Sequence, residues 1–132
     1  MKKLLTAVVV FIIFSASTVH AEIKTYTGVG EYLLTEETLE FGKNQAEISA
    51  ARDILDKICV YVKGRSLMID NELNDDEVIT ISAGILHVTD TKFVISDDAE
   101  GILVKAFVTA EIDTNELESL LDKEIKARNQ EN

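Results

Sequence analysis

The sequence predicts an α+β domain in which a small three-stranded, mainly antiparallel sheet packs against one long helix, with a short helix and a C-terminal helix. Three observations indicate this fold. Apolar residues recur at steps of four within residues 35–62, and they alternate strictly along residues 102–112. The elements also follow the order strand, helix, helix, strand, strand, helix, which is typical of an α+β rather than an alternating α/β chain.

Residues 1–21 are predicted to be a secretory signal peptide. Two lysines precede an apolar run and then small residues up to Ala21, so we expect cleavage between Ala21 and Glu22. The apolar run is shorter than the about 20 residues that span a bilayer as a helix, and no cysteine directly follows it for lipid attachment. We therefore expect an exported protein, periplasmic or secreted, whose residues 22–132 form one domain with no stable membrane anchor after cleavage.

The charge balance bears on the class of partner. The sequence carries 24 acidic and 13 basic residues, and the predicted signal peptide removes two lysines and no acid, which leaves a formal charge of −13. Nucleic-acid binding requires clustered lysine and arginine, so we expect no nucleic-acid partner. The acidity is interpreted as a source of solubility, with attraction of cations or of a basic partner as the alternative.

Residues 23–33 are predicted to form the first strand, because β-branched and aromatic residues are frequent there. Gly28 and Gly30 interrupt this strand just before a helix, which superficially resembles a dinucleotide-binding turn. However, Leu33 occupies the third glycine position of that motif, and no basic residue is placed to bind a phosphate. We interpret the glycines as a bulge or as a close approach of the long helix to the strand.

Residues 35–62 are predicted to form the long helix, with Thr35 or Thr38 as its N-terminal cap. The buried stripe is predicted to consist of Ala46, Ala50, Ile54, Ile58 and Val62, with Ala51 and Leu55 filling the same stripe. Cys59 lies beside this stripe and is the only cysteine, so no internal disulfide can form. We interpret it as a buried, unreactive thiol rather than a nucleophile.

The run from Asp70 to Glu77 is the most acidic part of the sequence. An EF-hand loop counted from Asp70 would need glycine at its sixth and glutamate at its twelfth position, and both are different here. We therefore interpret Asn74 as the cap of a short helix over residues 75–83, closed by Gly84. Binding of a small ligand or divalent cation by this acidic run is the alternative function.

Residues 85–95 and 102–112 are predicted to form two strands joined by a hairpin loop. The second should be the central strand beneath the long helix, because its alternate residues are all apolar. In the first, the apolar phase shifts, which predicts a bulge near residues 89–91. This shift turns His87 toward the wetter face, where we interpret it as an ordinary strand residue rather than a metal ligand or base.

The other face of the second strand carries the candidate interaction surface, which consists of Leu103, Lys105 and Phe107. These residues would leave an exposed apolar patch if no helix covers that face. The chain then ends in a helix capped by Asp113 or Thr114, whose apolar face consists of Leu117, Leu120, Leu121 and Ile125.

No pattern of residues indicates a catalytic, cofactor-binding or metal-ligating site, so we expect a protein that is not an enzyme and has no cofactor. A hydrolase that uses a pair of carboxylates for acid–base chemistry is the least favoured alternative, because sequence cannot show the cleft that such a pair needs.

Several segments together resemble a known family. They are residues 28–32 (GVGEY), 60–62 (VYV), 73–79 (LNDDEVI), 82–85 (SAGI) and the alternating 104–114. In these the chain resembles the N-terminal domain of flagellar assembly protein T and the related twenty-kilodalton surface lipoprotein family, over most of residues 24–121. The resemblance implies a non-enzymatic envelope domain, used in some relatives to build rings around the flagellar motor and in others displayed at the outer membrane. The partner is expected to be an unidentified envelope protein or a second copy of the chain.

Overall fold

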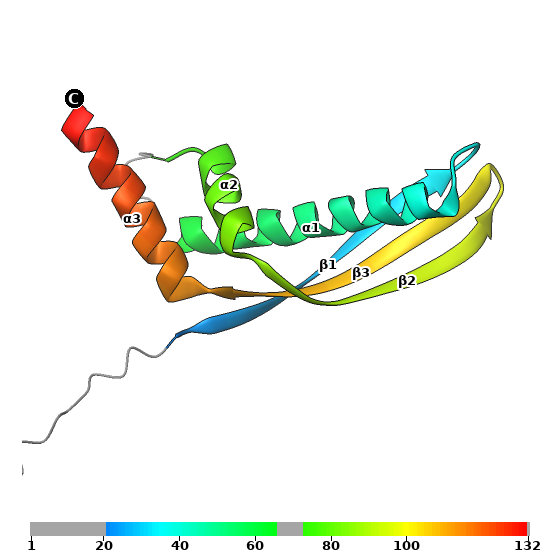
Figure 1. Ribbon diagram of the computed structural model, residues 1–132, viewed down its shortest axis with the longest axis horizontal. Coiled ribbons are helices and arrows are strands. Elements are labelled where there is room, and N and C mark those ends of the chain that lie inside the picture. The colour runs from blue at the N-terminus through cyan, green and yellow to red at the C-terminus, as the bar shows by residue number, and fades with distance from the viewer. Residues whose placement is uncertain (1–20, 66–72, 132) are drawn as a thin grey trace, which may run out of the picture.

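The computed structural model describes residues 21–65 and 73–131, and it has the predicted α+β fold. Its elements are β1 (Ile23–Leu34), α1 (Leu39–Gly64), α2 (Asp75–Ile85), β2 (His87–Asp98), β3 (Gly101–Asp113) and α3 (Thr114–Glu131). Figure 1 shows α1 lying along one face of the sheet, with α2 and α3 gathered at its C-terminal end. None of the helices in residues 21–65 and 73–131 combines the length and the hydropathy that a membrane-spanning helix requires.

The sheet has the strand order β1-β3-β2, and both pairings are antiparallel, so β3 is the central strand as predicted. β1 pairs with β3 without interruption from Ile23 opposite Asp113 to Leu34 opposite Ile102. The pairing of β2 with β3 shifts register between Val88 and Asp90, which confirms the predicted bulge.

Helix α1 begins at Leu39, four residues later than the predicted start. Thr38 is the cap, and its hydroxyl oxygen accepts a hydrogen bond from the N–H of Phe41 at 3.2 Å. The residues before it form a turn instead, because the Glu37 carboxylate accepts hydrogen bonds from the N–H groups of Thr35 (3.1 Å) and Glu36 (3.2 Å). These backbone bonds lower the pKa of Glu37 to about 2.

The two glycines of β1 allow α1 to approach the sheet closely, which confirms that interpretation of the sequence. Gly28 lies beneath Ala50, and a Cβ atom placed on it would overlap the Ala50 carbonyl oxygen and lie 2.7 Å from Cγ1 of Ile54. Gly30 lies beneath Ala46 and Ala50 in the same way. Because the glycines of β1 lie against the alanines of α1, the backbones of this strand and this helix come almost into contact.

The hydrophobic core lies between α1 and the central strand. Two residues of the predicted helix stripe, Ala51 and Leu55, are only partly buried, because they lie at its margin. The other five are at most 1% exposed. They meet the inner face of β3, whose buried residues are Val104, Ala106, Val108, Ala110 and Ile112. Ile102, the first residue of the predicted alternating run, is 41% exposed, because it lies at the hairpin end of the strand.

The two shorter helices close the other end of this core. Asn74 caps α2, with its side-chain oxygen accepting from the N–H of Glu77 at 2.9 Å, as predicted. Gly84 does not end this helix, which continues to Ile85, so β2 begins at His87 instead of residue 85. Asp113 caps α3, because its carboxylate accepts hydrogen bonds from the N–H groups of Asn115 at 3.0 Å and Glu116 at 3.3 Å.

Candidate interaction surfaces

Leu103, Lys105 and Phe107 lie on the face of the sheet opposite α1. This follows from the alternation along β3, because their neighbours Val104 and Ala106 are buried under the helix. Phe107 is 41% exposed, whereas Leu103 and Lys105 are half-buried. The structure therefore places the three predicted residues together on one uncovered face, with Phe107 the most accessible apolar group.

The strand register adds apolar neighbours that the sequence did not reveal. Phe107 pairs with Val29 of β1, which is 45% exposed, and Leu103 pairs with Leu33. Val94 of β2, opposite Lys105, is 51% exposed on the same face. We call these five apolar residues the outer patch; they are Val29, Leu33, Val94, Leu103 and Phe107.

One ion pair lies within the outer patch. Nζ of Lys105 lies 3.3 Å from a carboxylate oxygen of Glu31, its partner across the β1–β3 pairing. Both side chains remain substantially exposed, so the pair contributes little to stability. Its position between two apolar rows instead gives the outer patch a polar feature that a partner could recognise.

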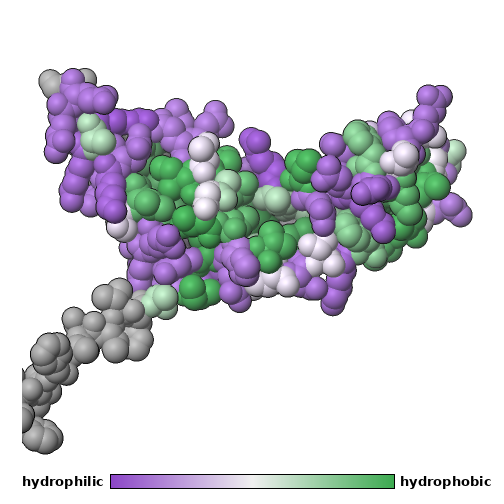
Figure 2. Space-filling model, viewed as in Figure 1, coloured by the Kyte–Doolittle hydropathy of each residue, from purple (hydrophilic) through white to green (hydrophobic). Residues whose placement is uncertain are grey.

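Exposed apolar residues continue at the hairpin end of the molecule. Leu39 and Phe41 at the start of α1 are each 43% exposed, and Ile95 of β2 is 46% exposed. Figure 2 shows apolar surface at this end, on the right, interrupted by polar side chains. Exposed apolar residues also occur on α1, where Val60 is 70% and Ile48 is 56% exposed, so the sheet and its hairpin end carry only part of the apolar surface.

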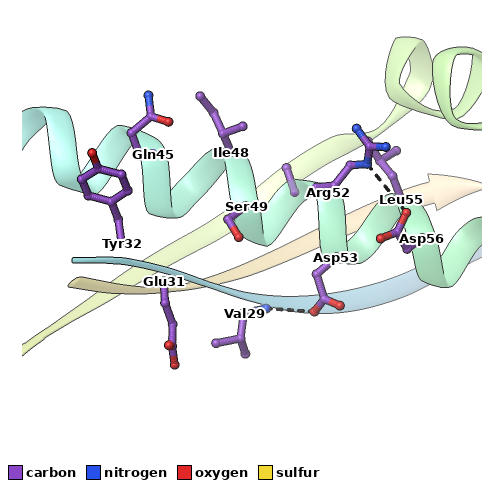
Figure 3. A pocket seen from close by; sticks show the side chains of 11 residues that line it. Val29, Glu31, Tyr32, Gln45, Ile48, Ser49, Arg52, Asp53, Leu55 and Asp56 are labelled. Carbon is purple, nitrogen blue, oxygen red and sulfur yellow. Dashed lines mark hydrogen bonds and ion pairs between the residues drawn. The ribbon is translucent and has the colours of Figure 1, made fainter. Parts of the chain in front are cut away.

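The free edge of β1 is closed by side chains of α1. A carboxylate oxygen of Asp53 accepts a hydrogen bond from the N–H of Val29 at 3.1 Å (Figure 3), and Nζ of Lys57 donates to the carbonyl of Thr27 at 2.6 Å. Asp53 and Lys57, which are four residues apart on α1, also form an ion pair at 3.2 Å. The bond from Val29 is the main reason why the pKa of Asp53 is lowered. These two bonds occupy outward backbone groups in the middle of β1 and so hinder another strand from pairing there.

The free edge of β2 differs, because this strand is exposed over nearly its whole length. Among the residues of β2, only Thr91 and Phe93 are partly buried, and all the others are exposed. Helix α1 packs over β1 and β3 but hardly reaches β2, which leaves a groove of about 370 Å³ between them. The groove is lined by Asn44, Glu47, Ile48 and Ala51 of α1, by Val88 and Thr91 of β2, and by Val108 of β3.

The acidic run is only partly within the described residues, since residues 70–72 lie outside them. Of the described acids, Asp75 lies 2.5 Å from Nζ of Lys63, and the Glu77 carboxylate pairs with Arg128. Asp75 in turn raises the pKa of Lys63. No group of three or more His, Cys, Asp or Glu side chains that could hold a metal ion occurs among residues 21–65 and 73–131.

The single cysteine is buried, as predicted. Cys59 is 5% exposed, and burial is the main cause that raises the pKa of its thiol, with the nearby Asp75 carboxylate as the next cause. A thiol with a raised pKa is a poor nucleophile at neutral pH. His87 is exposed and pairs with Glu111 on the outer face of the sheet, so it also lies where the sequence predicted.

The predicted cleavage point lies at the start of the described residues. Ala21 is exposed, and the carbonyl of Glu22 accepts hydrogen bonds from the N–H and the hydroxyl of Thr114, at 2.9 and 3.0 Å. The residue that follows the predicted cleavage point is thus attached to the start of α3.

A shallow hollow of about 910 Å³ lies over α1 and the edge of β1 (Figure 3). Its side chains do not converge, because Ile48 and Gln45 point away from the sheet while Glu31 points to the opposite side. Arg52 is engaged by Asp56 at 3.8 Å. We find no arrangement of nucleophile, base and orienting group in it. In comparisons with known proteins, no protein-family model and no curated protein matches this chain.

Proposed function

We propose that the chain is an exported, non-enzymatic envelope protein whose domain acts as a structural or protein-interaction module. The observation that carries this proposal is the outer patch, five apolar residues on the one sheet face that no described helix covers. Contiguous exposed apolar surface that is rimmed by polar residues is typical of protein docking sites. The interaction proceeds through this face, with Phe107 as its central contact.

Phe107 and Val29 indicate how much free energy the burial of the outer patch could contribute to binding. These residues are 41% and 45% exposed, so a partner that covers them removes a substantial apolar area from water. Complete burial of such a side chain contributes about 1.5–3 kcal/mol, and partial burial correspondingly less. The outer patch can therefore supply several kcal/mol to an interface, which suits a docking surface better than a catalytic centre.

The expected partner is an unidentified envelope protein or a second copy of the chain, with no cofactor and no nucleic acid. The acidic charge supports the exclusion of nucleic acid. The predicted signal peptide supports export to the periplasm or the medium. The resemblance to flagellar assembly protein T and the surface lipoproteins supports a structural role in the envelope, and implies no catalytic residue.

The proposal is tested with residues 22–132 and the variants Phe107→Ser and Phe41→Ser. These two phenylalanines are 41% and 43% exposed, so they are matched in accessibility but lie on different parts of the surface. Size-exclusion chromatography with light scattering measures self-association, and a pull-down from envelope extract measures capture of a partner. We expect Phe107→Ser to abolish the association and Phe41→Ser to preserve it. A strict monomer that retains nothing, or equal loss in both variants, would contradict the proposal.

A further inference from the structure

We propose that the free edge of β2 binds an extended, basic segment of another polypeptide, which adds to the sheet as a fourth strand. This site is separate from the outer patch, because the added strand places its apolar side chains in the groove on the α1 side. The inference does not depend on the proposed function. It rests on the difference between the two sheet edges, on the groove and on the local charge.

In an antiparallel sheet, successive residues alternate between bonding to the neighbouring strand and pointing away from it. This alternation identifies the backbone groups of β2 that face outward. Thr27 and Val29 of β1 direct their carbonyl and N–H outward, where Lys57 and Asp53 engage them. Because Val29 does not bond to its partner Phe107 on β3, the backbone groups of Phe107 point toward β2 and bond to Lys92. The alternate residues of β2, which are Thr91, Phe93 and Ile95, therefore direct their N–H and carbonyl groups away from the sheet. One edge is thus closed by α1, and the other presents a row of backbone groups that a strand can pair with.

The side chains of the same three residues lie on the α1 side of the sheet. Thr91, Phe93 and Ile95 pair with Val108, Ala106 and Val104, all of which are buried beneath the helix. Alternate side chains of an added strand would point to the same side and enter the groove.

The groove offers apolar contacts to such side chains. Val88 at its β2 side is 47% exposed, and Ile48 at its α1 rim is 56% exposed. Val108 of β3 forms part of its lining. An occupant with small or branched apolar residues at alternate positions would cover this surface.

The charge around the site favours a basic occupant. Four acidic side chains line the groove or belong to β2, namely Glu47, Asp90, Asp97 and Asp98. The lysine of β2, Lys92, lies with its Nζ 3.9 Å from Asp90, so these two charges offset each other. Lys43 of α1 lies beside the strand, with its Nζ 5.2 Å from the Phe93 ring centre. Glu47, Asp97 and Asp98 therefore leave an acidic balance at this edge. A second copy would bring a formal charge of −11 or lower to this acidic edge, so charge complementarity selects a basic strand.

The test uses a synthetic peptide of about nine residues, a usual strand length, with isoleucine or valine at alternate positions and lysine or threonine between them. It is titrated into nitrogen-15-labelled residues 22–132, and backbone amide shifts and hydrogen exchange are measured. We expect shifts centred on Thr91, Phe93 and Ile95, with slowed exchange of their N–H groups. A peptide methylated on alternate backbone nitrogens, and one with glutamate in place of lysine, should each bind at least about tenfold more weakly.

A matched pair of variants identifies the face that the peptide uses. Val88→Lys and Val94→Lys make the same change on the same strand at residues 47% and 51% exposed, but on opposite faces. We expect Val88→Lys to weaken peptide binding at least about tenfold and Val94→Lys to change it by less than about twofold. Phe107→Ser should leave peptide binding unchanged, which separates this site from the outer patch. The spectra of β3 amides show whether each variant remains folded.

Four outcomes of the peptide titrations would overturn the proposal. They are no amide shifts at millimolar peptide, shifts that follow the outer patch, equal weakening by the two lysine variants, and equal binding of the glutamate peptide. A concentration-dependent dimer with protected β2 amides would assign the edge to a second copy and overturn it as well.

Discussion

Replacing Gly30 by alanine is expected to destabilise the domain, although alanine is usually the better strand residue. The added Cβ would overlap the Ala46 carbonyl oxygen and the Ala50 amide nitrogen, and it would lie 2.8 Å from Cβ of Ser49. The first two atoms belong to the α1 backbone, so no side-chain rotation relieves the contact, and the helix must move away from β1.

Two opposing contributions determine how much Gly30→Ala changes the free energy of unfolding. Overpacking of this kind costs about 1–3 kcal/mol, and a backbone contact lies at the upper end of that range. Alanine loses less conformational entropy on folding than glycine does, and this difference stabilises the variant by about 0.5–1 kcal/mol. We therefore expect the free energy of unfolding to fall by about 2 kcal/mol, which lowers Tm by about 8 °C for a domain of this size.

The assay is thermal and urea unfolding of residues 22–132, followed by circular dichroism. Gly84→Ala is the control, because a Cβ at that exposed position of α2 meets nothing within 4 Å. It removes a glycine from a helix and should raise Tm slightly. If Gly30→Ala left Tm unchanged or raised it together with Gly84→Ala, the close approach of α1 to β1 would be wrong.

Three further predictions concern stability and ligand binding. Ile54→Asp should abolish the cooperative melt, because Ile54 is 0% exposed and an unpaired charge would be buried there, whereas Val60→Asp, at 70% exposure on the same helix, should melt near wild type. Because the pKa of Glu37 is lowered from 4.5 to about 2, its stabilising contribution is present above about pH 4.5 and is lost as pH falls through about pH 2. Urea unfolding between these values should therefore show a larger acid-induced loss of stability for wild type than for Glu37→Gln. Calorimetry with millimolar calcium should show no binding heat, since two of the three described acids of the run, Asp75 and Glu77, are paired with basic side chains. A clear saturable heat would instead support cation binding by the run from Asp70 to Glu77.

Local signals in the sequence predicted the helix caps well. Thr38, Asn74 and Asp113 each accept a hydrogen bond from a backbone N–H two or three residues later, and such a bond depends only on nearby residues. The start of α1 was predicted too early, because Thr35 is an equally good cap by residue type. Only the structure shows that the Glu37 carboxylate holds Thr35 in the preceding turn.

The surfaces were less predictable, because they depend on register and on the lateral position of α1. Alternation along β3 identified Leu103, Lys105 and Phe107, but not that Val29 lies beside Phe107. That neighbour follows from Gly28 and Gly30 packing under α1, since Val29 between them must then face away. The periodicity of β2 likewise marks Val88 as core-facing, yet the residue is 47% exposed because α1 lies over β1 and β3.

The central claim, that the chain docks on a partner through the outer patch, is tested most directly by photo-crosslinking in the native cell. A photoreactive phenylalanine analogue at position 107 should yield a discrete crosslinked product in the envelope fraction, and the same analogue at position 41 should not yield that product. No product from position 107, or the same product from both positions, would contradict the claim.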